Sequence, residues 1–108
     1  MIDKKIFSDR IEYYKDGKLH RENGPALEYA DGVKIWYKEG ELHREDGPAL
    51  EWSNGDKHWY QNGFSHREDG PAVEYINGNK EFWHKGKYFP QIKTTKEFIK
   101  LFKLKAFW

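Results

Sequence analysis

A seven-residue motif that returns at a fixed spacing constrains the fold more than any other feature of the chain. The motif reads His-Arg-Glu-(Asn/Asp)-Gly-Pro-Ala, and its copies begin at His20, His43 and His66, so the period is 23 residues. Aromatic residues and glycines between the copies recur in the same register. A unit of this length cannot bury its own apolar face, so successive units must stack on one another. The chain is therefore predicted to be a repeat array.

Each unit contains two glycine turns, of which the first carries the stronger hairpin signal. It consists of the pairs Asp31-Gly32, Asn54-Gly55 and Asn77-Gly78. Such pairs favour a two-residue type I′ turn, because both residues tolerate positive φ. In that register Leu27 opposes Trp36, and the predicted core face contains Leu27, Tyr29 and Trp36. The stem of Lys34 is expected along the Tyr29 ring.

The same register predicts a second hairpin face on which acids and rings alternate. Its members are Glu28, Glu51, Glu74 and Glu81, beside Tyr37, Tyr60 and Trp83. Carboxylates between rings suit a cationic partner, because Lys and Arg pair with acids and lie over aromatic faces. Glu74 is expected opposite Glu81, a like-charge pair that indicates a basic ligand or neutralisation by the Lys-rich C-terminal segment. The alternative is that each large ring covers a small alanine and the glutamates are solvated.

The repeated motif is predicted to form a structural corner. We expect Arg44 and Arg67 to bond backbone carbonyls, with Asp46 and Asp69 in Asx turns. Equivalent histidines in successive units would stand about 10 Å apart, whereas zinc requires ligand nitrogens at about 2.1 Å. The alternative to a corner is a surface binding row. No metal site is predicted.

Predicted binding residues come from both surfaces. His58 and Phe64 have non-equivalent counterparts in the other units, which makes them candidates for specificity. The full predicted set is Glu51, His58, Tyr60, Glu74, Trp83, Phe64, Arg44 and Arg67.

An aromatic residue is followed by an acid or Asn before Gly, then by two further residues and His, and this spacing resembles the MORN-type hairpin repeat over residues 13–89. The resemblance implies stacked β-hairpins. Arg after the His and the Asp-Gly-Pro-Ala corner depart from the family pattern, which separates the chain from the lipid-binding and membrane-tethering roles suggested for MORN proteins. The Trp-Tyr-x-x-Gly-x-x-His-Arg-Glu-Asp-Gly-Pro-Ala form resembles uncharacterised bacteriophage and bacterial proteins. That resemblance implies a phage accessory role, such as an inhibitor or modulator of a host defence protein.

Residues 1–90 are assigned to the array and residues 91–108 to a C-terminal helix. Thr94-Thr95-Lys96-Glu97 has the pattern of a capping box. The predicted apolar side contains Phe98, Ile99, Leu101, Phe102 and Ala106, and the opposite side contains Lys96, Lys100 and Lys103. We expect the helix to cover the open end of the array and to bury Phe107 and Trp108. Its alternatives are an oligomer or partner-helix surface, or a helix that binds membrane surfaces or nucleic acid.

Composition narrows the function further. A formal net charge of +1 provides no global field for nucleic acid or anionic membrane. The absence of Cys removes thiolate zinc sites, cysteine nucleophiles and disulfides, and fits a reducing compartment. No signal-peptide pattern is present, so a soluble cytoplasmic protein is expected, in the host cytoplasm if phage-encoded. None of Ser8, Ser53 and Ser65 lies in a Gly-x-Ser-x-Gly elbow, and no Walker loop or HExxH helix occurs.

These patterns predict a mainly β protein with one C-terminal helix, either an elongated twisted antiparallel sheet or an open solenoid of stacked hairpins. The expected function is a non-catalytic protein-interaction module without cofactor or metal. Its expected partner is another protein with a basic surface. The alternative function is binding of nucleotide signals or RNA through aromatic and basic residues. No membrane partner is expected, and self-association through the helix or a sheet edge stays an open alternative.

Overall fold

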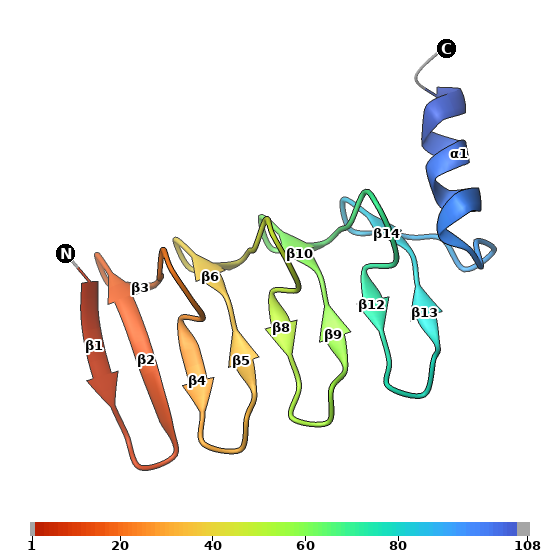
Figure 1. Cartoon of the computed structure of the whole chain (residues 1–108). Helices are drawn as coiled ribbons and strands as arrows, with labels where there is room; N and C mark the ends of the chain where they lie inside the picture. Colours follow the sequence, from red (N-terminus) through yellow and green to blue (C-terminus); the bar gives the residue numbers. More distant parts are fainter. Residues whose placement is uncertain (1, 106–108) are drawn as a thin grey trace.

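The computed structural model describes the backbone of residues 2–105 and the side chains of residues 2–102, and this part of the chain forms short antiparallel strands followed by one helix (Figure 1). The large sheet contains β1 (Ile2–Ile6), β2 (Arg10–Lys15), β3 (Lys18–Leu19), β4 (Leu27–Tyr29), β5 (Lys34–Ile35), β8 (Leu50–Glu51), β9 (Lys57–His58), β12 (Val73–Glu74) and β13 (Lys80–Glu81). Separate two-stranded ladders pair β6 (Tyr37–Lys38) with β7 (Glu41–Leu42), β10 (Tyr60–Gln61) with β11 (Phe64–Ser65), and β14 (Trp83–His84) with β15 (Lys87–Tyr88). The helix is α1 (Thr95–Lys105).

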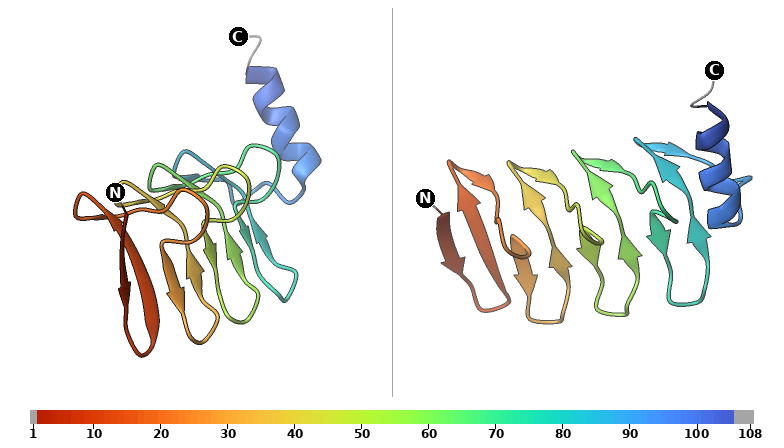
Figure 2. Two further views of the ribbon diagram at one scale, coloured as in Figure 1. Left: turned by 60° about the vertical axis from the view of Figure 1, so that its left-hand side comes forward. Right: turned by 45° about the horizontal axis from the view of Figure 1, so that its top comes forward.

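The hairpins of successive units lie side by side in an open row. The large sheet follows the order β1-β2-β4-β5-β8-β9-β12-β13, with β3 added to β2, and the molecule measures 48 × 32 × 18 Å. The short second hairpins lie along one side of this row, and α1 stands at the end opposite β1 (Figures 1 and 2). The predicted fold class, stacked hairpins with a C-terminal helix, is confirmed in its open form.

The first glycine turn differs from the predicted type I′ turn. The N–H of Tyr29 donates to the Val33 carbonyl (2.9 Å), and the N–H of Gly32 donates to the Tyr29 carbonyl (3.0 Å). The loop therefore has one residue more than predicted. Gly32 has φ of 103°, whereas Asp31 is not among the residues with positive φ. This is the geometry of a type I turn closed by a glycine bulge, and it recurs at Gly55 and Gly78.

The additional loop residue shifts the register by one, and a one-residue shift moves every side chain of the second strand to the other face. Leu27 pairs with Ile35 instead of Trp36. The predicted core face is therefore wrong, and so is the placement of Lys34 along Tyr29.

Type I′ geometry occurs instead at the second glycine turn of each unit. Glu39 and Gly40 have φ values of 50° and 83°, which is positive φ at both central positions. The equivalent turns are Asp16-Gly17, Asn62-Gly63 and Lys85-Gly86. These turns close the short second hairpins and leave room for only two paired residues on each side.

The fully buried side chains are alanines along the array and aromatic rings at its C-terminal end. Ala26, Ala49 and Ala72 are fully buried. Phe82, Phe89 and Phe98 form a buried cluster, against which Ile92, Leu101 and Phe102 pack. Because Phe98, Leu101 and Phe102 come from α1, the prediction that the helix covers the end of the array is confirmed.

The helix begins as its sequence predicts. The backbone N–H of Glu97 donates to Thr94 Oγ1 (3.1 Å), which caps the first turn. Lys96 and Lys100 are exposed, and Ile99 is half-buried. The predicted positions of Ala106, Phe107 and Trp108 and of the Lys103 side chain lie outside the described residues.

Candidate functional site

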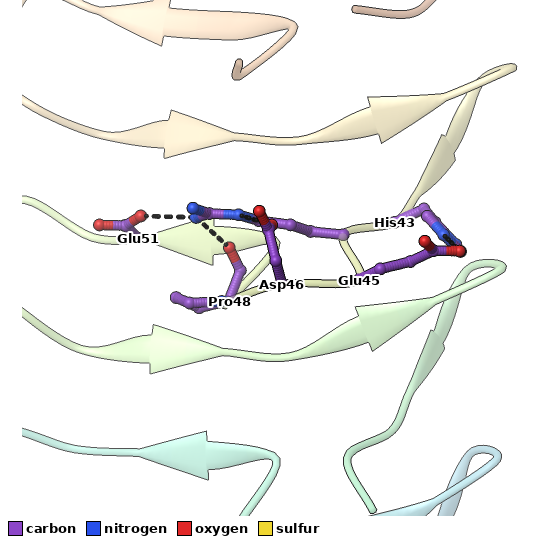
Figure 3. A network of polar contacts seen from close by, with 6 residues as sticks. His43, Glu45, Asp46, Pro48 and Glu51 are labelled. Carbon is purple, nitrogen blue, oxygen red and sulfur yellow. Dashed lines mark hydrogen bonds and ion pairs between the residues drawn. The ribbon is translucent and has the colours of Figure 1, made fainter. Parts of the chain in front are cut away.

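The repeated motif builds a corner around its arginine. The Arg44 guanidinium lies over the Trp36 ring, 3.9 Å from the ring centre. Its Nη1 donates to the Pro48 carbonyl (3.0 Å) and to Glu51 (3.1 Å), and its Nε donates to Asp46 (3.1 Å) (Figure 3). The predicted bond from Arg44 to a backbone carbonyl is confirmed. The predicted Asx turn at Asp46 is wrong, because its carboxylate accepts from the arginine and Pro48, two residues on, has no N–H to donate.

The other two copies repeat this arrangement. Arg67 lies over Trp59 (4.0 Å) and donates to the Pro71 carbonyl and to Glu74, and its Nε donates to Asp69, where an Asx turn was predicted. Arg21 lies over Tyr13 and donates to the Pro25 carbonyl and to Glu28. We call this surface the arginine face; it consists of Tyr13, Arg21, Glu28, Trp36, Arg44, Glu51, Trp59, Arg67 and Glu74. Each of its arginines is matched by a carboxylate of the same chain.

The histidine of the motif joins each unit to the next. His20 Nδ1 accepts the backbone N–H of Glu39 (3.0 Å), His43 Nδ1 that of Asn62 (3.0 Å), and His66 Nδ1 that of Lys85 (2.8 Å). An imidazole nitrogen that accepts an N–H uses the lone pair that a metal ion would need. Among the residues described, no group of three His, Cys, Asp or Glu side chains is placed to hold a metal ion.

The opposite surface of the sheet carries rings that no arginine of the motif covers. We call it the aromatic face; it consists of Tyr29, Tyr37, Trp52, His58, Tyr60, Tyr75, Glu81, Trp83 and Tyr88. His58 lies near its middle, since β9 pairs with both β8 and β12. The His58 ring meets Trp52 (6.5 Å) and Tyr75 (6.1 Å) edge-on and stacks parallel to Tyr60 (6.5 Å between centres).

A carboxylate surrounded by rings lies beside His58 on this face. Tyr75 Oη donates to Glu81 Oε2 (3.1 Å), and Trp83 Nε1 donates to Glu81 Oε1 (3.0 Å). Trp83 in turn stacks on Tyr88, with 4.9 Å between ring centres. The aromatic face therefore presents an anion whose position is fixed by two aromatic donors.

Burial changes the protonation of this face. Desolvation lowers the pKa of His58 below its ordinary value, and the nearby Asp56 and Glu81 carboxylates oppose that shift. Desolvation also raises the pKa of Tyr75, and its hydrogen bond to Glu81 raises it further. At neutral pH His58 is therefore uncharged and acts as part of the ring cluster.

The predicted binding residues do not form one site. Glu51, Glu74, Arg44 and Arg67 lie on the arginine face and bond one another within the chain. His58, Tyr60 and Trp83 lie on the aromatic face. Phe64 lies on β11, is 58% exposed and extends toward Gly86 of the next unit.

The predicted like-charge pair is absent from the observed register. Glu74 pairs with Lys80, and Glu81 pairs with Val73. The hypothesis that Glu74 and Glu81 together attract a basic ligand is therefore wrong. Sequence reasoning also missed Trp52 and Tyr75, which repeat Tyr29 of the predicted core face in the next two units. Only the register reveals that these rings share a face with His58.

Comparison of the chain with protein-family models, curated proteins and solved structures returned no match. Within the described residues, no helix is long and apolar enough to span a bilayer.

Proposed function

We propose that this chain is a non-catalytic protein-interaction module whose partner binds the aromatic face. The contact of His58 with Trp52, Tyr60 and Tyr75 on one surface of the sheet carries the proposal. Trp52 is 45% exposed. Tyr and Trp are enriched at the centres of protein interfaces, because they bury a large area with few rotatable bonds.

The charges on this face favour a partner with basic side chains. Asp56 and Glu81 are the charged groups whose electrostatic effect on the pKa of His58 is resolved, and both are acidic. Lys57 and Lys80 are adjacent in sequence to His58 and Glu81, and strand alternation directs them to the other face. A partner Lys or Arg can lie over Trp83 and Tyr88 and reach Glu81, which has lone pairs beyond the two that Tyr75 and Trp83 use.

We expect the basic partner at the aromatic face and no longer at Glu51 and Glu74. Those carboxylates already accept from Arg44 and Arg67. The same ion pairs weaken the alternative of RNA or nucleotide binding, since phosphate recognition relies on cations that displace counterions. From the resemblance to bacteriophage proteins, the proposal takes a bacterial host protein as the partner. From the absence of Cys, it takes the cytoplasm as the compartment.

Quantitative capture from a bacterial lysate tests which face binds. Immobilised wild type is compared with Tyr60→Ala and Trp83→Ala on the aromatic face. Lys57→Ala and Lys80→Ala are controls on the opposite surface of the sheet, where these lysines pair with Glu51 and Glu74 of the arginine face. We expect either aromatic variant to capture at least about tenfold less of the partner than wild type does. A loss of this size is typical when an interface anchor is removed. The two controls should retain the partner.

Thermal unfolding of each variant separates lost binding from lost folding. A protein that all four variants capture equally would contradict the proposal. So would one that only the lysine variants lose, because it would place the binding surface on the arginine face.

A further inference from the structure

Within the described residues, every second residue of the edge strand β1 has backbone groups that no other strand pairs with. β1 pairs with β2 in the register Ile2–Lys15 to Ile6–Ile11, and it is the first strand in the sheet order. The N–H of Phe7 donates to the Arg10 carbonyl, so every second residue from Phe7 back to Asp3 bonds β2. The N–H and C=O groups of Ile2, Lys4 and Ile6 therefore point away from the sheet.

Apolar side chains accompany these outward groups. All five residues of β1 are exposed, with Ile2 at 39% and Ile6 at 71%. A strand edge of this kind is a template for pairing with another strand. Among the described residues, no element lies against this edge, whereas the last unit packs against α1.

Backbone geometry restricts how a second copy of β1 can pair with the first. In an antiparallel ladder, residues with outward groups must oppose one another. Registers centred on Asp3 or Lys5 leave some of the outward groups unpaired. The register centred on Lys4 pairs all the outward groups, because Ile2 opposes the second copy's Ile6 and Lys4 opposes Lys4.

Side-chain charges favour the same register. Centred on Lys4, it places Asp3 of each copy opposite Lys5 of the other, which forms the same ion pair at two symmetric positions. Asp3 has no ion pair within the described part of the chain. The Lys4–Lys4 contact is the unfavourable one, and the Lys4 ammonium lies toward the Tyr13 ring, 5.7 Å from its centre.

We propose that β1 is a self-association site, through which two copies of this chain form an antiparallel dimer with one continuous sheet. The symmetry axis of such a pair is perpendicular to the sheet, so both aromatic faces lie on the same side. Independently of what binds there, the dimer presents that surface twice. A partner with two binding segments would then gain from a raised effective concentration.

Charge exchange in β1 tests the proposal. The full chain is studied by sedimentation velocity over a concentration series at low and at physiological salt. Asp3→Lys and Lys5→Asp should each weaken the dimer at least about tenfold, because like charges then face one another at both positions. An equimolar mixture of these two variants should form a heterodimer, and the double variant Asp3→Lys/Lys5→Asp should dimerise like wild type.

A backbone variant gives a second measurement. Lys4→Pro removes an outward N–H and leaves the β1–β2 hydrogen bonds in place, so we expect a monomer with a Tm within a few degrees of wild type. A wild-type chain that stays monomeric up to about 1 mM would overturn the proposal. Dimerisation that is unchanged by all the β1 substitutions would also overturn the proposal. It would place the self-association site elsewhere, for example on α1. The monomeric variants are also tested for capture of the partner. This measurement shows whether the aromatic face still binds, so failure of the dimer proposal can be distinguished from failure of the proposed function.

Discussion

The two ends of the array meet solvent in different ways. In each motif-bearing unit an arginine covers the aromatic ring that precedes it, as Arg67 covers Trp59 at 4.0 Å. Pro90 stands where the next arginine would fall, and Phe98 lies against the equivalent ring, Phe82, with 5.2 Å between ring centres. At the other end, no element among the described residues covers β1, and all residues of β1 are exposed.

This difference shows that the repeated residues supply packing contacts for a unit only where another unit follows it in the array. The C-terminal unit needs non-repeating residues to replace the missing arginine, and Phe89, at the position of the motif histidine, joins the same buried cluster. The N-terminal end needs no replacement for buried rings, because its rings already face Arg21 and the lysines of β1. Among the described residues of this end, the groups without a protein partner are backbone N–H and C=O groups of β1.

Removing the aromatic cover should have the largest effect on stability. Phe98 is fully buried against Phe82, Phe89 and Phe102. We expect Phe98→Ala to lower the free energy of unfolding by about 3–5 kcal/mol, through lost transfer energy and a cavity. Denaturant unfolding measures this loss. Phe7→Ala at the β1 end is the matched control and should cost about 1 kcal/mol, because the Phe7 ring is 43% exposed and loses a contact with the Arg10 guanidinium, 4.2 Å from the ring centre. Equal losses would mean that the two ends do not differ as described.

An intermediate loss is expected inside the array. Arg44→Ala removes the contact with Trp36 and leaves the Pro48 carbonyl and the Glu51 carboxylate without this donor. Because the pair is partly exposed, we expect about 1–3 kcal/mol, measured by denaturant unfolding. Arg21→Ala should cost less, since Asn23 stands where the other copies carry an Asp that bonds the arginine. A greater loss for Arg21→Ala would contradict this order.

The smallest effect concerns pH and the middle of the sheet, between the two ends. Burial lowers the pKa of His58 below its ordinary 6.5, so the unfolded chain binds a proton that the folded chain does not. Stability therefore falls as pH decreases below about 6.5, and the loss is complete below the folded pKa. We expect His58→Gln to show a smaller decrease in Tm between about pH 7 and pH 5 than wild type does. The same dependence of Tm on pH in both chains would exclude a contribution from His58.

Sequence reasoning predicted the repeat, the hairpins and the capping helix, because these depend on spacing and on local signals such as Thr94 before Glu97. It did not predict the register. Asn54-Gly55 suits both a two-residue type I′ turn and a longer loop with a glycine bulge, and these differ by one residue. That single residue decides whether Trp59 or His58 shares a face with Trp52.

The true type I′ turns gave a weaker sequence signal. Glu39 and Lys85 adopt positive φ, although such residues rarely occupy that region. Part of the arginine face could be predicted from the sequence, since each of Tyr13, Trp36 and Trp59 precedes an arginine by the same number of residues. Glu51 and Glu74 accept from Arg44 and Arg67, so Glu51→Lys or Glu74→Lys would place a lysine against an arginine and would perturb folding as well as any binding.

The histidine bonds between units have a consequence for how the chain is made. Each spans 19 residues, from His20 to Glu39, His43 to Asn62 and His66 to Lys85. Contacts so close in sequence favour fast folding, and a ribosome that adds about 5–20 residues per second delivers each segment after its predecessor. Units can thus fold in the order of their synthesis, and each lacks its contacts with the following unit until that unit has been synthesised. The last unit packs against Phe98, so a stall in synthesis before that codon would leave Phe82 and Phe89 uncovered.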